Sequence, residues 1–582
     1  MKLFPVWILL VMGSPVRAQF FSKVINSPLS TTIGDSRSVN WVDVNGDGYI
    51  DCFISNGPQA GQNNMLYIND TNGNFTAVTN DPIVMDGMPS DGATFADIDN
   101  DDDLDAFVVN WYNKNNLAYV NDGTGAFTKV VDGTWVNHLG YSETASFGDY
   151  NNDGLVDLYV TNSEGNKKNF LYKNLGSHMM ESIVEGSPVT DAGSSRNVSW
   201  TDIDNDGDPD LFVTNENGEK DHLYRNDGGG LFTKLTEPLI TVDQYSTMSG
   251  SWGDIDNDGD LDVFLANDGS KNQLFRNEGN FVFSRILTTA ISSATAKSFS
   301  SAWADIDNDG DLDLFVTNAF QNGVRLKNKL FVNDGTGDFT EVTDDVVVMD
   351  QGWSYGCAFG DYDNDGFQDL AVATTRFGGA DEADYLYHNN GNENHWLMIS
   401  LEGKTTNRSA IGAKVRVKAV VNGVAIWQMR EISAQSAYCS QNDMRAHFGL
   451  GLAEKVDSIT IEWPSGIVQH LTNVLPNQIL DVEEDLVNAV PHEQSSFGLK
   501  VFPNPTNAGI QIEAHFADHS NEVLLEVYGD TGQIVYSATF AHVGGLWEYQ
   551  LDLRKLQLIP GQYIVRLSNG VDGEERKVIF IQ

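Results

Sequence analysis

One acidic loop, Asp-x-Asp/Asn-x-Asp-Gly-x-x-Asp, occurs seven times in this chain, each copy about 51 to 56 residues after the last. Side chains at loop positions 1, 3, 5 and 9, with the main-chain carbonyl of position 7, offer hard oxygen ligands around one point. That number and charge of ligands suits Ca²⁺, whereas Mg²⁺ requires a tighter octahedron and keeps its waters. Position 6 needs a left-handed turn residue; it is glycine in six loops and Asp102 in the second.

We therefore expect about seven structural calcium ions, because four side chains and a carbonyl nearly fill a coordination sphere and leave no open catalytic position. Seven copies with one spacing also argue against a merely solvated acidic surface. From loop 1 to loop 7, the predicted ligands are Asp43, Asn45, Asp47, Tyr49 and Asp51; Asp97, Asp99, Asp101, Asp103 and Asp105; Asp149, Asn151, Asp153, Leu155 and Asp157; Asp202, Asp204, Asp206, Asp208 and Asp210; Asp254, Asp256, Asp258, Asp260 and Asp262; Asp305, Asp307, Asp309, Asp311 and Asp313; and Asp361, Asp363, Asp365, Phe367 and Asp369.

An EF-hand is the obvious alternative for such a loop. It requires a bidentate Glu at position 12 and a helix on each side. Position 12 is apolar in all seven copies, and each loop is followed by a short β-branched and aromatic run, such as 312–317. An aromatic residue also stands two positions before every loop. Each loop therefore joins two strands, and the EF-hand is rejected.

The elements that position these loops form a repeat. After the second strand, a third strand and a fourth follow, often joined by Asn-Asp-Gly turns as at 121–123, 226–228 and 333–335. Four strands per repeat predict one propeller blade each, so we expect an all-β, seven-bladed calcium-binding β-propeller. The seventh repeat lacks its fourth strand, and residues 20–24 are predicted to supply it. An Asn 13 residues after most loop starts, such as Asn56, is interpreted as a turn residue.

Charge and composition limit the partners. The 582 residues carry 82 acidic and 35 basic side chains, a formal net charge of -47, which argues against nucleic acid and anionic lipid. Residues 1–18 are predicted to be a signal peptide, and no later apolar stretch is long enough to be a transmembrane segment. The three cysteines form no disulfide framework, and Cys52 is expected to be a small core residue.

The repeats, at residues 19–393, resemble the FG-GAP/VCBS repeats of integrin alpha-subunits and of many bacterial exported proteins. This resemblance implies a calcium-stiffened propeller that binds macromolecules. Residues 394–486 resemble the ASPIC/UnbV domain, which follows such repeats in the cartilage acidic protein family; the motifs include Phe448-Gly-Leu-Gly451 and Trp463-Pro-Ser-Gly466. Their alternating strands predict a small β-sandwich. Four basic residues there could contact an anion, but surface charge is the preferred interpretation: Arg408, Arg430, Arg445 and His447.

A polar linker is predicted at 487–497. Residues 498–582, with Val501-Phe-Pro-Asn-Pro505 and Gly561-Gln-Tyr-Ile-Val-Arg-Leu567, are similar to the C-terminal sorting domain of the type IX secretion system of Bacteroidota. A second β-sandwich is expected here. The resemblance implies a protein that is secreted or attached to the outer surface, with the type IX secretion machinery as one partner.

We expect an exported, non-catalytic binding or adhesion protein that recognises a glycan or an extracellular protein. Loops such as 320–327 and 376–381 would supply the contacts. The alternative is a polysaccharide-degrading enzyme, a lyase or hydrolase, with its active site on the propeller face; a third possibility is a purely structural matrix component. No acid–base signature supports the enzyme, because the histidines of the repeats share no common position: His138, His178, His222 and His388.

Overall fold

The computed structural model describes residues 19–287, 290–292, 295–376, 378–485, 490–491, 500–502, 509–516, 522–529, 534–541, 545–556, 561–568 and 573–580. The predicted signal peptide 1–18, the Pro-Asn-Pro motif at 503–505 and all of the predicted linker except 490–491 lie outside these residues. The chain divides into two compact units, Met1–Ala489 and Val490–Gln582.

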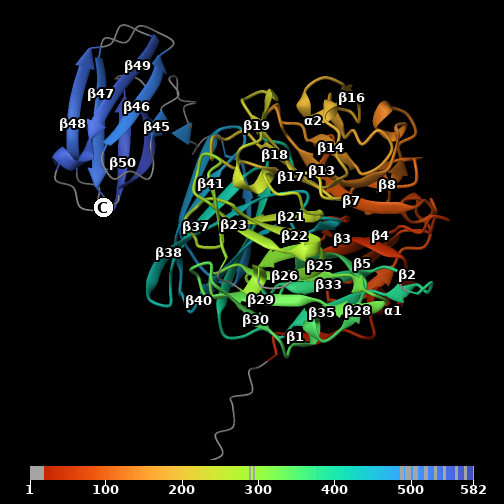
Figure 1. Ribbon diagram of the computed structural model, residues 1–582. Helices are drawn as coiled ribbons and strands as arrows, with labels where there is room; N and C mark the ends of the chain where they lie inside the picture. The colour runs from red at the N-terminus through yellow and green to blue at the C-terminus, as the bar shows by residue number, and fades with distance from the viewer. Residues whose placement is uncertain are drawn as a thin grey trace, which may run out of the picture. The chain divides into compact units, whose positions relative to one another are not determined.

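Each of the seven repeats forms a four-stranded antiparallel sheet, here called sheets 1 to 7 (Figure 1). The first strands are β3 (Ser36–Val42), β7 (Ser90–Ala96), β13 (Ser142–Gly148), β17 (Ser195–Thr201), β21 (Thr247–Gly253), β25 (Thr295–Ala304) and β32 (Ser354–Gly360). The second strands are β4 (Asp51–Asn56), β8 (Asp105–Asn110), β14 (Asp157–Asn162), β18 (Asp210–Asn215), β22 (Asp262–Lys271), β26 (Asp313–Asn318) and β33 (Asp369–Thr374). Every acidic loop joins a first strand to a second, as the sequence predicts.

The outer half of each sheet follows in the same order. The third strands are β5 (Met65–Asn69), β10 (Leu117–Val120), β15 (Phe170–Asn174), β19 (His222–Asn226), β23 (Gln273–Asn277), β29 (Lys329–Asn333) and β35 (Tyr385–Asn389). The fourth strands are β6 (Phe75–Ala77), β11 (Thr128–Lys129), β16 (Met180–Ile183), β20 (Phe232–Leu235), β24 (Phe283–Arg285), β30 (Phe339–Val342) and, in sheet 7, β1 (Phe21–Lys23). All-β structure is therefore confirmed for the described repeats.

The second strands are buried along their whole described length where they lie within a sheet. Six successive residues of β8, Asp105–Asn110, are all buried, because neighbouring sheets cover both faces of the strand and leave no solvent-facing side. Cys52 is fully buried in β4, as predicted. Each first strand carries a register shift near its start, as between Ser36 and Val39; such a bulge turns the strand end.

The seven sheets close into a cycle. Each first strand contacts the first strand of the next sheet, and β32 contacts β3. The N-terminal strand β1 pairs with β35, with Phe21 opposite Asn389, and so completes sheet 7. This confirms the predicted role of residues 20–24 and covers an edge that would otherwise be open.

Short elements connect the sheets on the side opposite the acidic loops. They are β2 (Ile33–Gly34) paired with β34 (Glu382–Ala383), β9 (Lys114–Asn115) with β12 (Leu139–Gly140), and β27 (Phe320–Gln321) and β31 (Gln351–Gly352) with β28 (Val324–Lys327). The helical elements are single turns: α1 (Pro28–Thr31), α2 (Ser187–Thr190), η1 (Pro82–Val84), η2 (Thr134–Val136), η3 (Leu239–Thr241), η4 (Ala290–Ser292) and η5 (Val346–Val348).

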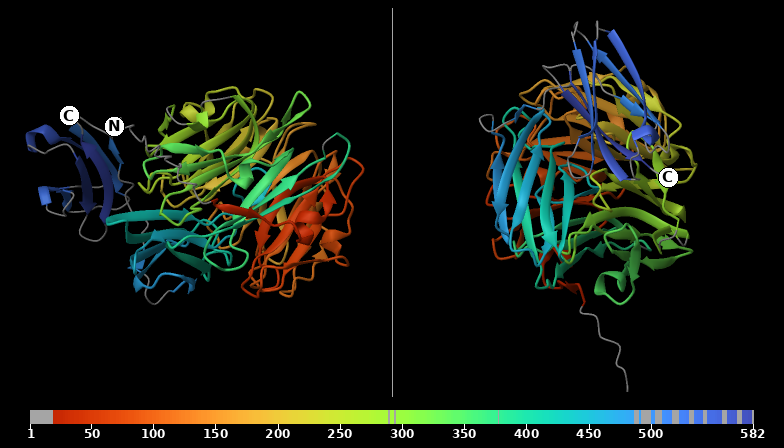
Figure 2. Two further views of the ribbon diagram at one scale, coloured as in Figure 1. Left: turned by 90° about the horizontal axis from the view of Figure 1, so that it is seen from below. Right: turned by 90° about the vertical axis from the view of Figure 1, so that its left-hand side faces the viewer.

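The downstream domain, residues 394–486, packs against the ring within the first unit (Figure 2). One sheet has the order β40–β36–β43, and the other the order β38–β37–β41–β42. Its strands are β36 (His395–Glu402), β37 (Lys414–Val421), β38 (Val424–Glu431), β39 (Ser440–Gln441), β40 (Ala446–Gly451), β41 (Val456–Glu462), β42 (Ile467–Val474) and β43 (Gln478–Glu483). β39 leaves both sheets and pairs in parallel with β3 of the ring.

The second unit contains two sheets around one apolar cluster that includes Ile512, Leu525 and Trp547. Their orders are β45–β46–β49 and β48–β47–β50–β51. The strands, after the short β44 (Val490–Pro491), are β45 (Lys500–Phe502), β46 (Gly509–Phe516), β47 (Glu522–Gly529), β48 (Ile534–Ala541), β49 (Gly545–Asp552), β50 (Gly561–Ser568) and β51 (Gly573–Phe580), with η6 (Leu553–Leu556) after β49. Among the described residues of the whole chain, no helix has the length and apolarity to cross a membrane.

Candidate metal centres

The first Asp of each acidic loop organises the loop backbone. In loop 1, Asp43 accepts the N–H groups of Asp47 and Gly48 at 3.2 and 2.8 Å. The same two hydrogen bonds, from positions 5 and 6, recur in the other six loops. Position 6 is left-handed throughout; Asp102 adopts a φ of 78° and takes the place that glycine has elsewhere.

The last Asp of each loop is buried and ties the loop to the third strand of its own sheet. It accepts the N–H of the Asn that ends that strand at 2.7 to 2.9 Å. Burial raises the pKa of Asp51 to about 7 and that of Asp105 to about 8. A bound cation would reverse this effect, because a nearby positive charge favours the ionised carboxylate.

The position 3 carboxylates give a test of whether a cation fits these loops. One buried oxygen, Oδ1, has no hydrogen-bond partner in Asp99, Asp204, Asp256 or Asp363. Buried oxygens without partners are costly, and a coordinated ion would satisfy them. Ligand atoms from positions 1, 3 and 5 lie within 4.8 Å of one another in loops 2 and 4, and those from positions 1, 3 and 9 do so in loop 5. The donor set, carboxylates only in these groups, fits a hard ion such as Ca²⁺.

At positions 3 and 7, the residue types of the predicted ligands differ between loops. Asn45 and Asn151 replace the position 3 carboxylate in loops 1 and 3, and Asn45 is hydrogen-bonded to Asp47 within its own loop. In six loops, the backbone N–H of position 7 donates to the side-chain carboxylate of position 5, at 2.9 to 3.2 Å. This hydrogen bond fixes the turn next to the main-chain carbonyl of position 7, which is a predicted ligand. The members of that set are Tyr49, Leu155, Asp208, Asp260, Asp311 and Phe367.

Cationic side chains approach several loops, which the sequence analysis missed. Lys173 lies 3.1 Å from Asp153, and Arg276 lies 2.7 Å from Asp256. Two of the histidines that share no sequence position also lie at loops: His178 at Asp99 and His388 at Asp369. The hydrogen bond to Asp369 raises the pKa of His388 to about 9. Lys173, Arg276 and His388 all precede the Asn that ends a third strand, so aligning the repeats on that Asn would have found them.

The same third-strand asparagines link neighbouring loops, also missed from sequence. Each Nδ2 donates to the main-chain carbonyl of position 2 in the preceding loop, at 2.7 to 2.9 Å. Asn69 of sheet 1 reaches Tyr362 of loop 7 and so closes the circle. In the Asn-Asp-Gly segments interpreted as turns, the Asn is this linking residue. The donors are Asn69, Asn121, Asn174, Asn226, Asn277, Asn333 and Asn389.

A second set of links joins the loops at position 4. There, left-handed asparagines donate to the main-chain carbonyl of position 6 in the next loop, as from Asn100 to Gly154 at 3.0 Å. Four further links of this kind have distances of 3.0 to 3.2 Å. Five of the seven junctions between neighbouring loops therefore have this bond; position 4 of loop 1 is Gly46, and Asn205 of loop 4 donates to the side chain of Asp260 instead. By contrast, Asn56, predicted to be a turn residue, is the last residue of β4 and donates to Asn63 in the turn that follows.

The downstream domain contacts the acidic loops with basic side chains. Arg408 pairs with Asp102, and Lys414 lies 2.8 Å from Asp202. Arg445 donates to Asn364 and to the carbonyl of Asp361, at 2.8 and 3.1 Å. His447 is buried and lies 3.1 Å from the carbonyl of Gly366. Arg430 is half-buried, close to the carboxylates of loops 5 and 6.

The interpretation of these basic residues as surface charge was therefore wrong for Arg430, Arg445 and His447. They face the ring because the net acidity of the loops attracts them. The sequence has acidic loops in one segment and basic residues in another, but charge alone does not show that the two segments are in contact.

The loop between β38 and β40 fills the axis of the ring. Gln441 exchanges hydrogen bonds with the backbone of Phe95, at 2.9 and 3.0 Å. At the tip, the fully buried Tyr438 hydroxyl lies 2.8 Å from Glu143, 2.9 Å from Arg196 and 3.0 Å from Tyr355. These three residues share the second position of their first strands, so one ring of side chains surrounds the inserted tip.

Comparisons with known proteins support this organisation. An FG-GAP-like repeat model matches residues 43–108, 149–213, 202–265, 254–316 and 319–372. An ASPIC and UnbV model matches 403–488, and a model of the secretion system C-terminal sorting domain matches 500–582. Cartilage acidic protein 1 of Xenopus tropicalis is 27% identical over 309 residues, 52% of this chain and 46% of that protein. The human protein of the same name is 24% identical over 369 residues, 61% and 53% respectively.

The chain thus spans about half the length of the curated relatives it matches. Among solved structures, a protein from Lactobacillus plantarum superposes with a TM-score of 0.37 and 14% identity, over 55% of this chain and 87% of that one. The sorting domain assigns this protein to type IX secretion, to the cell surface or exterior. The chain thus carries FG-GAP-like repeats, an ASPIC/UnbV domain and a secretion system C-terminal sorting domain, and it is similar to cartilage acidic protein 1.

Proposed function

We propose that this exported protein is a calcium-stabilised, seven-bladed propeller that binds a glycan or an extracellular protein and catalyses no reaction. Each repeat sheet would be one blade, and the downstream domain and the sorting domain would be small β-sandwiches. About seven Ca²⁺ ions would be held by the acidic loops and act structurally. They would neutralise carboxylates that otherwise repel one another across neighbouring loops.

The observation that supports this proposal most is that the two faces of the ring differ in structure. One face carries the acidic loops, and the downstream domain contacts them through Arg408, Lys414 and Arg445. The opposite face carries the turns between second and third strands. Its turns differ in length and composition from sheet to sheet, as binding loops on a rigid scaffold do.

The turns of this second face offer suitable contact residues. The hairpin β27–β28 and the turn at 376–381 both lie there; Phe377 lies outside the described residues. In sheet 2, Trp111 packs edge-on against Tyr112 and Tyr141, with ring centroids 4.6 and 5.1 Å apart. All three rings are half-buried and belong to none of the hydrophobic clusters of the described residues. Such aromatic residues provide large, rigid contact areas.

The enzyme alternative would need carboxylates in an accessible pocket. Among the described residues, the group that most resembles an acid–base site is the carboxylate pair Asp91 and Glu143. It lies beside Arg37 and Arg196. Desolvation by burial, and after it the charge of Glu143, raises the pKa of Asp91 to about 8. Tyr438 of the downstream domain occupies this place and bonds to Glu143. We therefore assign the group a structural role.

The test combines a glycan array, an extracellular-protein binding screen and polysaccharide degradation assays, each with calcium and with chelator. Calcium-dependent retention without shortened or unsaturated sugars is expected. Trp111→Ala should weaken retention, whereas Trp427→Ala, at an exposed tryptophan of the downstream domain, should not. Release of sugar products by the full-length chain would instead establish the enzyme.

A further inference from the structure

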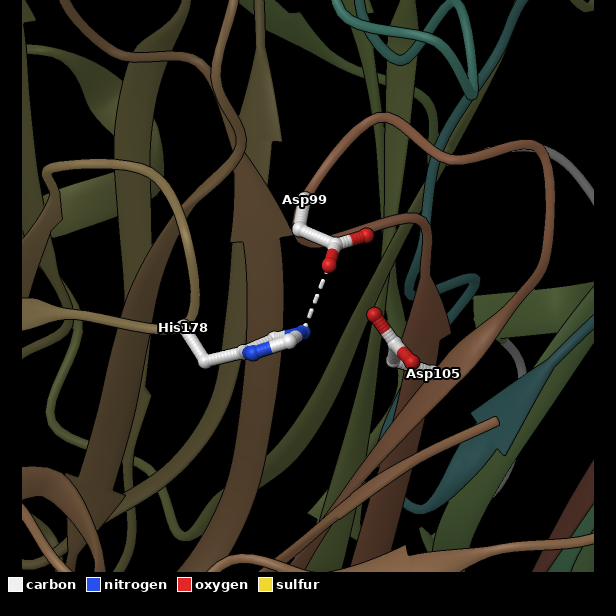
Figure 3. Close-up of side chains that lie close together, drawn as sticks. All are labelled: Asp99, Asp105 and His178. Atoms are coloured by element: carbon white, nitrogen blue, oxygen red, sulfur yellow. Dashed lines mark ion pairs between the residues drawn. The ribbon is translucent and has the colours of Figure 1, made fainter. Parts of the chain in front are cut away.

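Loop 2 differs from the other loops in its chemistry. It carries an aspartate at position 6 and another at position 7, in addition to the four carboxylates of the common pattern. A histidine from the neighbouring sheet also reaches it. Asp99, Asp105 and His178 hold ligand atoms within 4.8 Å of one another, and Figure 3 shows the imidazole and both carboxylates turned toward a common point.

The approach of His178 is built into the turn between β15 and β16. Ser177 and His178 adopt left-handed conformations, with φ of 52° and 61°. Sheet 5 has the same turn with Phe281, φ 60°, in the equivalent place. There the aromatic ring packs into the apolar cluster that contains Ile203 of loop 4. The turn thus places one side chain at the loop of the preceding sheet, and in sheet 3 that side chain is an imidazole.

The imidazole lies within ligand distance of the loop carboxylates. His178 Nε2 lies 2.7 Å from Asp99 Oδ2. Asp99 Oδ1 and Asp103 Oδ1 are buried without partners. Two ligand atoms that are each about 2.1 Å from one metal ion lie about 3 Å apart. The nitrogen of His178 and the oxygens of Asp99 and Asp105 are therefore close enough together to be ligands of one ion.

The lysine and arginine near other loops cannot take this role. Lys173 at Asp153 and Arg276 at Asp256 are donors only and can act solely as charge partners. At loop 7, His388 forms a similar group with Asp363 and Asp369, but its ring nitrogen Nδ1 also lies 3.2 Å from Asp369 as a hydrogen-bond partner. Imidazole has a lone pair, and it suits zinc and related first-row ions, whereas Ca²⁺ is bound by oxygen ligands. A cleft of about 540 Å³ between loops 1 and 2 and the downstream domain is lined by Asp97, Asp102 and Asp103, so ions can reach this loop.

We propose that loop 2 and His178 form a mixed nitrogen–oxygen site that selects a first-row transition ion, represented by Zn²⁺, over Ca²⁺. The ligands would be His178 with Asp99 and Asp105, and the neighbouring Asp97 and Asp101 would complete the site. The other loops without a histidine would keep Ca²⁺. This inference rests on the proposed calcium loops, and it adds a distinct metal to one of them.

The experiment measures bound metals on the full-length chain. The protein is equilibrated with millimolar calcium and micromolar zinc and desalted, and both metals are counted by mass spectrometry. Retention of zinc by the wild type and loss of one zinc per chain in His178→Gln are expected. His222→Gln serves as the control, because His222 lies against Tyr224 rather than at a loop. Cobalt offered in place of zinc should give an absorption spectrum that depends on His178.

The variant His178→Lys separates the proposal from a simple charge pair. If His178 acts only as Lys173 does, His178→Lys will bind metals like the wild type, and the proposal fails. It also fails if the wild type retains calcium but no zinc, or if His178→Gln retains the same zinc. An absence of both metals from the wild type would instead overturn the calcium loops themselves. Equal melting temperatures of the variants in calcium would show that each is folded.

Discussion

At the scale of single residues, sheets 4 and 7 depart from the others in a way that predicts a pH effect. Asp221 accepts the N–H of Asn215 at 2.7 Å and the Thr247 hydroxyl at 3.0 Å. Five sheets have an Asn in this place, and sheet 7 has Asp384. Burial raises the pKa of Asp221 to about 8. The native state therefore holds this proton more tightly than the unfolded chain.

Asp221→Asn is expected to remove a pH-dependent loss of stability. A carboxyl with a raised native pKa contributes stability that is fully present below its ordinary pKa of 3.8 and is lost as the pH rises toward 8. The variant should thus melt above the wild type at about pH 8.5, with a smaller difference at about pH 5.5. Thermal unfolding in saturating calcium at both pH values measures this. Asp384→Asn should behave in the same direction, and an equal shift at both pH values would contradict the account.

Residue types and spacing were sufficient to predict the strand on each side of a loop and the burial of Cys52. They were not sufficient for the linking role of Asn277 or the metal-loop contact of His178. Those depend on which sheets are neighbours, and a single repeat cannot show this. The turn interpretation of Asn121 was incomplete for the same reason, because its side chain bonds to a loop 77 residues away.

At the scale of elements, the asparagine links should couple adjacent sheets. Asn277 is buried and donates to the carbonyl of Ile203 in loop 4 at 2.9 Å. Asn277→Ala would leave that carbonyl without a partner and is expected to lower the free energy of unfolding by about 1–3 kcal/mol. Denaturant unfolding in calcium measures the loss. Asn80→Ala, at an exposed asparagine, is the control, and an equal effect of the two substitutions would count against the link.

The inserted loop of the downstream domain gives a second prediction at this scale. Tyr438→Phe removes the hydroxyl that bonds to Glu143, Arg196 and Tyr355 and should cost about 1–3 kcal/mol. Tyr438→Ala also opens a cavity and should cost about 3–5 kcal/mol. Limited proteolysis should cut within 433–445 more readily in the alanine variant. Tyr245→Phe, at a half-buried tyrosine outside the axis, should change neither measurement; unchanged proteolysis of Tyr438→Ala would mean that the tip does not hold the loop.

At the scale of the whole molecule, the ring combines repetition with local differences. The loops, links and second strands repeat in all seven sheets, and the sequence period predicted the loops and the strands. The side chains that follow the Ser or Thr paired with the end of each second strand do not repeat: Arg37, Asp91, Glu143 and Arg196 are charged, whereas Met248, Phe299 and Tyr355 are not. Tyr438 contacts members of both groups. Because these contacts join segments 83 to 295 residues apart, no local sequence pattern could have predicted them.

Calcium removal should destabilise the entire first unit, since an asparagine of the next sheet is hydrogen-bonded to every loop and a vacant loop weakens the sheet beside it. The formal net charge of -47 adds repulsion that the ions would offset. We expect chelator to lower the melting temperature, and added calcium to raise it with concentration by mass action. Sodium chloride should recover part of the loss, because it screens repulsion without filling the loops. Full recovery by salt alone would show that charge, rather than coordination, stabilises the ring, and no change on chelation would mean that the loops bind no calcium.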